Sequence, residues 1–389
     1  MPKTDSDRRT LPYWRLSGFY FFYFASLGTL LPYWSLYLKS LGFDARAIGS
    51  LMALIMATKI VSPNIWGWIA DHTGRRMRIV RIGGLLSTIA FLGVFFGNDF
   101  WWLALVMLVF SFFWNATLPQ FEATTLNHLG EESHRYSGIR LWGSIGFIIA
   151  VAALGPVLDR QGTALLPWVL MLLFTAIWLA SLGVPERVTG HQHLEHVPLR
   201  RVLGRPEVLA LLAVCFLLQA SHGPYYTFYT LYMEDHGYSR SVIGQLWALG
   251  VIAEVGVFLL MHRLVPRFGL RRLLLVSLGL TALRWWLIAE FPQAMLPVVV
   301  AQCLHAASFG MYHAVAIQLV HRYFVGRLQG RGQALYSSVS FGAGGAVGSY
   351  LAGIGWNSVG GQVVYLMAAV GALMAFAVAW RWVRPGAPV

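Results

Sequence analysis

One short charged stretch, residues 67–78, decides how the chain is interpreted. It reads Gly67-Trp-Ile-Ala-Asp71-His-Thr-Gly74-Arg75-Arg76-Met-Arg and lies between two apolar blocks. A glycine such as Gly67 lets neighbouring helices approach closely. An anion at a helix end, here Asp71, can pair with a basic loop residue and with the N-terminus of a neighbouring helix. Remaking such contacts can bias one of two conformations, so all five numbered residues are candidates for a conformational switch.

The apolar residues on either side of this stretch come in long blocks. Of 389 residues, 57% are hydrophobic and 12% are charged, whereas a soluble domain carries about 25% charged residues. Roughly 20 apolar residues cross a bilayer as a helix, and lipid requires the backbone to satisfy its own hydrogen bonds. The sequence therefore predicts an all-α membrane protein, not an enzyme, with twelve transmembrane helices. They are expected near 13–38, 46–70, 79–97, 100–126, 138–158, 164–184, 207–232, 241–261, 272–290, 295–318, 332–355 and 361–382.

The basic residues predict the orientation of these helices. The net charge is +13, with 29 Lys and Arg. If the N-terminus is cytoplasmic, 22 of them fall on the cytoplasmic side, four on the opposite side and three inside helices. This bias toward the inside predicts that both termini are cytoplasmic. The positive charge is thus explained by topology, and we expect the lipid bilayer, not nucleic acid, as the partner of these residues.

The chain repeats itself at an offset of 195 residues. Ile48-Gly49 recurs as Ile243-Gly244, and Gly74-Arg75-Arg76 matches Gly269-Leu270-Arg271 loosely. Each repeat holds six predicted helices, and an even number gives both repeats the same orientation. We expect six-helix bundles at 1–184 and 207–389, joined by a cytoplasmic linker at 185–206. Histidines in the linker have no further support as ligands, so we expect no metal and no cofactor.

Charged residues inside the predicted helices are candidates for function, because placing them in a membrane is costly. Lys59 and Glu254 occupy matching positions of the two repeats, so they could pair when one side of the protein closes. Histidines at three positions accompany the charged residues. The full set is Lys59, Glu122, Arg140, Glu254 and Arg284 with His222, His305 and His313.

Polar and aromatic residues also share helix faces. Spacings of three and four place Gln219, His222, Tyr225 and Tyr226 on one face of the seventh helix. Tyrosines can instead serve packing or an interfacial belt, and a membrane histidine can simply bond a neighbouring helix. His305 and His313, eight residues apart, can face one cavity.

Residues 67–78 resemble the signature loop of the major facilitator superfamily, whose transporters are built from two parallel six-helix repeats. Other stretches resemble the 3-phenylpropionate permease group of bacteria, which is related to lactose permease and to nucleoside–proton symporters. These stretches are 31–35 with 38–39, 140–144, 219–226, 249–251 with 254, 284–285, and Gln302, His305 and His313.

The resemblance implies roles for individual residues. In lactose permease a Glu on helix four and an Arg on helix five bind substrate, and Glu122 and Arg140 are similar. A helix-eight Glu, a helix-nine Arg and a helix-ten His serve proton coupling, and Glu254, Arg284 and His305 are similar. The helix-ten Glu of lactose permease has no match here. The expected proton carrier is therefore Glu254 or a histidine, with His313 included.

These observations predict a monomeric transporter of a bacterial inner membrane that works by alternating access. We expect proton-coupled symport of a small organic solute, best described as an aromatic carboxylate. Arginine pairs well with a carboxylate. The aromatic ring of such a substrate could pack against four aromatic residues, Tyr33, Trp34, Tyr225 and Tyr226. A nucleoside or sugar symporter, a proton-driven exporter and a non-transporting receptor remain open alternatives.

Overall fold

The structure is a computed structural model that describes residues 11–187 and 202–384, and every regular element in these ranges is helical. Nine continuous segments of the described residues are long and apolar enough to cross a membrane. Two of them, with 62 and 54 residues, are far longer than the roughly 20 residues of one crossing. They turn back at Glu132 and at Gly360. With the tyrosine-rich helix at residues 13–40, the described chain makes twelve crossings, as the sequence predicts.

The first six crossings follow the predicted blocks closely. Asp44 begins the second crossing by accepting a hydrogen bond from the Ala47 amide at 2.8 Å, and Asp99 caps the fourth in the same way. The elements are α1 (Tyr13–Ser40), α2 (Ala45–Thr73), α3 (Arg76–Phe91) with η2 (Leu92–Phe95), α4 (Phe100–Leu129), η3 (Gly130–Arg135), α5 (Tyr136–Gln161), η4 (Thr163–Leu165) and α6 (Leu166–Leu182).

The later crossings are less regular than the sequence predicts. The seventh crossing is interrupted at His222, next to Gly223-Pro224, because proline lacks the amide that the helix needs. The tenth and eleventh each contain a π-helical turn, a feature that is frequent at functional sites. The elements are α8 (Pro206–Ser221), α9 (Gly223–Asp235), α10 (Arg240–Phe268), α11 (Leu270–Glu290), α12 (Met295–Cys303), η5 (Ala306–Met311), α13 (Tyr312–Tyr323), η6 (Gly326–Leu328), α14 (Gln329–Ser337), η7 (Ser338–Gly344) and α15 (Gly345–Trp382).

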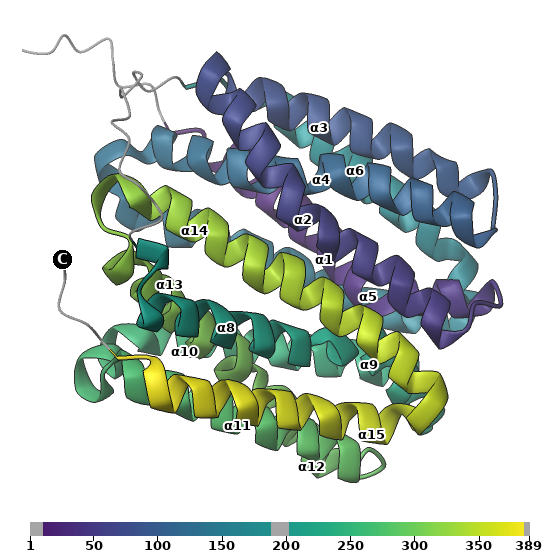
Figure 1. Cartoon of the computed structure of the whole chain (residues 1–389). Coiled ribbons are helices and arrows are strands. Elements are labelled where there is room, and N and C mark those ends of the chain that lie inside the picture. The colour runs from purple at the N-terminus through teal and green to yellow at the C-terminus, as the bar shows by residue number, and fades with distance from the viewer. Residues whose placement is uncertain (1–10, 188–201, 385–389) are drawn as a thin grey trace, which may run out of the picture.

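Helices α1–α6, here called the first half, gather in the upper part of Figure 1, and helices α8–α15, the second half, lie below them. The halves pack through α2 on α15 and through α5 on α10. A Cβ on Gly49 of α2 would lie 2.7 Å from the Cα of Gly353 of α15, so the two backbones touch. The division at 1–184, 185–206 and 207–389 stays a prediction, and linker residues 188–201 lie outside the described residues.

Polar contacts between the halves are concentrated at one end of the molecule. We call the end with the α2–α3 and α10–α11 turns the basic end. At the opposite end Lys39 pairs with Asp235 at 2.9 Å, and Asp159 of α5 accepts hydrogen bonds from the start of α10. Toward the basic end, Asn64 of α2 bonds Ser338 at 3.1 Å. Between Ser338 and the turns of the basic end, no hydrogen bond or ion pair among the described residues joins the halves. The opposite end is therefore the more firmly closed one.

Candidate functional site

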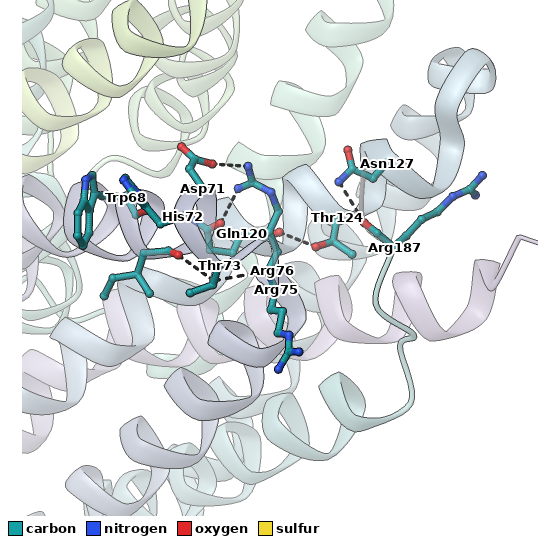
Figure 2. Close-up of polar contacts among 11 residues, drawn as sticks. Trp68, Asp71, His72, Thr73, Arg75, Arg76, Gln120, Thr124, Asn127 and Arg187 are labelled. Carbon is teal, nitrogen blue, oxygen red and sulfur yellow. Dashed lines mark hydrogen bonds and ion pairs between the residues drawn. The ribbon is translucent and has the colours of Figure 1, made fainter. Parts of the chain in front are cut away.

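The turn after α2 holds a compact polar network (Figure 2). Gly74 ends α2 with φ of 66°, a left-handed conformation in which side chains are strained. The Asp71 carboxylate accepts a hydrogen bond from Arg76 at 2.6 Å, and Arg76 also donates to Gln120 of α4 at 2.7 Å. Asp71 thus pairs with a basic residue of its own turn. These contacts all lie within the first half.

A different carboxylate occupies the N-terminus of α3. Both Glu186 oxygens lie 3.1 Å from the Met77 amide, and neighbouring Arg187 donates to the His128 carbonyl at 2.8 Å. The contact of Asp71 with a neighbouring helix start, expected from the sequence, is not among the described contacts in this conformation. Glu186 caps α3 instead, because the chain after α6 returns to the start of α3 and the end of α4.

Three other predicted switch residues make fewer contacts than expected. A Cβ on Gly67 would lie 3.6 Å from the Gln120 side chain, an ordinary contact distance, so no close approach requires glycine there in this conformation. The Arg75 side chain points away from Asp71 in Figure 2. Lys59 is half-buried and has no polar partner among the described residues, Glu254 included.

Helices α4 and α5 bring Glu122 and Arg140 together. The Arg140 Nε lies 3.9 Å from Glu122 Oε1, which is longer than a hydrogen bond. Tyr136 donates to the same Glu122 oxygen at 3.3 Å. The Arg140 guanidinium carbon lies 3.8 Å above the centre of the Phe24 ring of α1, a cation–π contact. Among the described residues no hydrogen bond involves the Arg140 guanidinium, so its donors are available to a ligand.

This pair lies on an accessible surface inside the protein. The side chains of Arg140 and Glu122 are 30% and 34% exposed, so a ligand can reach both. Arg140 is also within electrostatic range of Glu254 and His313 of the second half. Arg140 therefore lies on the side of the first half that is nearer to the second half.

Arg284 of α11 is the opposite case, a fully buried arginine whose donors are used. Its guanidinium lies 4.1 Å from the Tyr225 ring centre and 4.6 Å from that of Trp285. A buried charge also needs hydrogen-bond partners. The guanidinium donates to the Ala301 carbonyl at 2.9 Å, Ser308 Oγ at 2.9 Å, His305 Nδ1 at 3.1 Å and Gln302 Oε1 at 3.4 Å.

His305 connects Arg284 to Glu254. Its Nε2 lies 3.2 Å from Glu254 Oε2. Because Arg284 can only donate, His305 Nδ1 must accept, and the neutral ring then carries its proton on Nε2 and donates it to Glu254. Gly310 in the π-helical turn η5 makes room for this arrangement, since a Cβ there would lie 3.0 Å from Glu254 Cγ. Arg284 and Glu254 are therefore linked through a histidine.

An aromatic group extends this cluster toward α9 and α10. The Tyr225 and Trp247 ring centres are 4.4 Å apart, and partly exposed Tyr226 stacks with His222 at 5.8 Å. Several buried polar atoms here have no partner among the described residues. They are Gln219 Nε2, His222 Nε2, Tyr229 Oη and Gln302 Nε2. Buried polar groups are normally hydrogen-bonded. These four atoms can therefore form hydrogen bonds with a ligand, or with other protein groups in another conformation.

Tyr33 and Trp34 lie apart from this cluster, whereas His313 lies at its edge, where Phe309 stacks on both His305 and His313. The Tyr33 hydroxyl donates to the Val151 carbonyl at 2.7 Å, toward the closed end. The Trp34 indole is fully buried against Tyr37 and against Phe91 of α3, on the side away from the second half. His313 Nδ1 lies 2.9 Å from the Tyr336 hydroxyl.

Sequence reasoning missed several residues that build the site. Tyr136 precedes Arg140 by four residues, so helical spacing could have placed both on one face. Phe24, Gln120 and Ser308 carry no such signal. Their roles depend on how separate helices pack.

With this geometry in place, the chain can be compared with known proteins. Residues 13–367 match the model of the family described as "MFS_1 like family". The chain belongs to this family of major facilitator transporters. It is therefore a multi-pass membrane transporter and not an enzyme.

Individual members of this group differ in what they carry. This major facilitator protein is 31% identical over 364 residues to the "Probable 3-phenylpropionic acid transporter" of Escherichia coli (strain K12), with 90% of this chain and 93% of that one covered. It is 28% identical over 347 residues to the maltose permease of Geobacillus stearothermophilus, with 86% of each covered. The crystal structure of nucleoside transporter NupG superposes with a TM-score of 0.81 at 18% identity, covering 95% of this chain and 99% of that one. That likeness shows the twelve-helix fold.

Proposed function

We propose that this transporter takes up a small aromatic carboxylate together with protons. The observation that carries this proposal is the unbonded guanidinium of Arg140 on an accessible internal surface. Arginine binds a carboxylate through two parallel hydrogen bonds. Glu122, at 3.9 Å, is too distant to occupy those donors fully. Arg284 is unsuitable because its donors are already engaged.

The aromatic part of the substrate follows from what surrounds the arginine. Phe24 lies directly against the Arg140 guanidinium, and Tyr226 presents a partly exposed ring from the second half. A planar ring carried next to a carboxylate could stack on such side chains. The name of the Escherichia coli relative, which pairs a phenyl ring with a carboxylate, agrees with this chemistry.

Proton coupling is assigned to Glu254 with its partner His305. A substrate carboxylate adds a negative charge to a site of low dielectric, where an unbalanced charge is costly. A proton taken up by Glu254 would offset that charge. His305 and His313 are the alternative carriers, and His305 would accept a proton on Nδ1 only when its bond to Arg284 breaks. Arg284 would hold His305 in position through the 3.1 Å bond to Nδ1.

We also infer how the protein is oriented in the membrane. The basic end faces the cytoplasm of a bacterial inner membrane, so both termini are cytoplasmic. The present conformation is then inward-facing, because the halves are joined mainly at the outer end. The Asp71–Arg76 turn acts as the switch that favours one state.

The test of topology places single cysteines in a variant with Cys215→Ala and Cys303→Ala. On intact cells an impermeant thiol reagent should label Arg160→Cys, because the α5–η4 turn would face outward. The same reagent should leave His193→Cys in the linker unlabelled. The reverse pattern would overturn the orientation.

The substrate is tested with the purified protein in liposomes. Vesicles loaded with unlabelled 3-phenylpropionate should exchange it for external radiolabelled 3-phenylpropionate, and an inward proton gradient should drive net uptake. Uridine and maltose should not compete. Exchange of uridine or maltose without exchange of 3-phenylpropionate would disprove the carboxylate assignment.

A nucleoside or sugar symporter is the second candidate. The Glu122–Arg140 pair offers an acceptor and several donors side by side, which suits hydroxyl groups. The maltose permease relative supports this alternative. The same exchange panel separates the two functions directly.

A further inference from the structure

The basic end of the second half contains a hollow of about 300 Å³ between the α10–α11 turn and α13. Three of its seven lining residues are arginines, and none is acidic. The lining residues are Val265, Phe268, Gly269, Leu270, Arg271, Arg272 and Arg322.

This turn is the internal repeat of the α2–α3 turn shown in Figure 2. The offset of 195 residues matches Gly74 with Gly269, and both glycines are left-handed, with φ of 66° and 74°. The same offset matches Arg76 with Arg271. The two turns therefore share a glycine with positive φ and a basic residue, although ψ is 6° at Gly74 and 156° at Gly269, and their sequences can be compared position by position.

The carboxylates of the first turn have no counterparts in the second. Asp71, which pairs with Arg76, is matched by Pro266. Glu186, which caps α3, is matched by Arg381. The second turn therefore keeps the arginine at the position of Arg76 and loses both carboxylates of the first turn, while Arg272 stands where the first turn has Met77.

Among residues 11–187 and 202–384, no other acidic side chain pairs with the arginines of this hollow. The sequence has no Asp or Glu between Glu254 and Glu290 and none after Glu290. Glu207, at the start of α8, pairs with Arg205 at 2.6 Å. The second turn therefore has no carboxylate of its own.

The three arginines of the hollow differ in how they are held. Arg271 is bound by backbone, since it donates to the Trp380 carbonyl at 2.5 Å and to the Val383 carbonyl at 3.1 Å. Within the described part of the chain, Arg272 and Arg322 have neither a hydrogen bond nor an ion-pair partner. These two guanidinium groups therefore have their donors available for an anion from outside the protein.

We propose that this hollow binds the headgroup phosphate of an anionic phospholipid. Arg272 and Arg322 can each donate two hydrogen bonds to phosphate oxygens, and anionic lipids are attracted to basic clusters at the cytoplasmic surface. Apolar side chains next to the hollow favour a lipid over a free anion. Phe268 is 42% exposed beside the hollow, and Leu259 and Leu260 of α10 are 69% and 47% exposed. Phe268, the one of these three that lines the hollow, can contact the acyl chains of a bound lipid, which a free phosphate lacks.

The experiment measures lipid adducts on the full-length, detergent-purified protein by native mass spectrometry. The probes are dioleoyl phosphatidylglycerol, dioleoyl phosphatidylcholine and inorganic phosphate. The test variant is Arg272→Gln with Arg322→Gln, which spares Arg271 because that residue holds the end of α15. The matched control is Arg263→Gln with Arg78→Gln, which removes the same charge from the basic end of the molecule but outside the hollow.

We expect phosphatidylglycerol to bind in preference to phosphatidylcholine. Each basic residue near an anionic surface strengthens binding roughly fivefold, so the test variant should bind phosphatidylglycerol about 30-fold more weakly. The control pair lies outside the hollow and cannot bond the bound phosphate, and salt screens such distant charges, so binding should change less than about threefold. A second variant, Arg272→Lys with Arg322→Lys, keeps both charges and should retain most of the binding.

Three results would overturn the proposal. Equal losses in the test and control pairs would mean that net charge alone attracts the lipid. Unchanged binding in the test pair would exclude these arginines. Full displacement of phosphatidylglycerol by inorganic phosphate, with no preference for the lipid, would identify a free-anion site. None of these results depends on which substrate the protein carries.

Discussion

Two arginines inside the helix bundle, Arg140 in the first half and Arg284 in the second, are in contrasting environments. Arg140 is 30% exposed, stacks on Phe24 and has no hydrogen bond among the described residues. Arg284 is fully buried and donates to a carbonyl, a hydroxyl, an amide and His305. The same side chain type is thus available for a ligand in one half and fixed as part of the structure in the other.

The different environments of Arg140 and Arg284 suggest different roles, substrate binding for one and proton coupling for the other. A guanidinium with unused donors can exchange water for a substrate carboxylate at low cost. A guanidinium whose donors are engaged instead orders the groups around it, here His305 and through it Glu254. We therefore assign substrate recognition to the first half and proton transfer to the second. Four substitutions test this assignment, in order of decreasing expected effect.

Replacing Arg284 should damage the structure most. Arg284→Gln leaves the Ala301 carbonyl, Ser308 and His305 without their donor, and breaking a buried charged network costs about 3–5 kcal/mol. We expect a large fall in the midpoint of thermal unfolding in detergent. Exposed Arg46→Gln is the control and should leave the midpoint unchanged. A stable Arg284→Gln protein that has lost only substrate binding would reverse the assigned roles.

Replacing Arg140 should remove binding while sparing stability. A hydrogen-bonded charge pair contributes about 3 kcal/mol, so Arg140→Gln should weaken 3-phenylpropionate binding roughly 100-fold. Isothermal titration gives the Kd, and the thermal midpoint should stay near that of the unchanged protein. Arg160→Gln, on the same helix α5 but exposed near the closed end, is the matched control. Binding of wild-type strength in Arg140→Gln would exclude it as the carboxylate site.

Replacing Glu254 should separate uptake from exchange. Glu254→Gln imitates the protonated side chain, so uptake driven by a proton gradient should be lost. Exchange at equal substrate concentrations should continue within about threefold of the unchanged rate, because exchange needs no net proton release. Both rates are measured in the same liposomes. Normal gradient-driven uptake would transfer the carrier role to His305 or His313, and loss of exchange would make Glu254 a binding residue.

Replacing Asp71 should have the smallest effect. The Asp71–Arg76 pair is partly exposed, and such pairs contribute about 1 kcal/mol or less. Asp71→Asn should slow exchange by a few-fold while the Kd stays unchanged, because Asp71 bonds Arg76 and makes no contact with Arg140 or Glu122. Arg75→Gln, whose side chain points away from Asp71, is the control. A large loss of affinity with normal cycling would contradict the switch role.

The sequence predicted the helices well where long apolar blocks end in charged or glycine-containing turns. The expected block at 100–126 corresponds to α4 at Phe100–Leu129, and the block at 272–290 to α11 at Leu270–Glu290. It did not predict the break at His222 or the π-helical turns η5 and η7. Such local changes depend on packing against other helices, which composition and periodicity do not describe.

The candidate site was predicted in part. Glu122 with Arg140, and Glu254 with His305, were named from the cost of placing charges in a membrane, and the structure brings each pair together. Trp34 was expected in the same site but lies against α3. The expected meeting of Lys59 and Glu254 is absent from the described contacts of this conformation.

By itself the sequence determined that the chain crosses a membrane twelve times, and it predicted a repeat after six helices with the positive charge on one side of the membrane. These properties follow from the amounts and order of apolar and basic residues, because apolar blocks are stable in lipid and basic residues are stable in water. Only the tertiary structure decided that Arg140 is available and Arg284 is not. The donors of Arg284 are occupied by acceptors from another helical segment, such as the Ala301 carbonyl and Ser308. How closely those acceptors approach depends on how helices pack across the bundle.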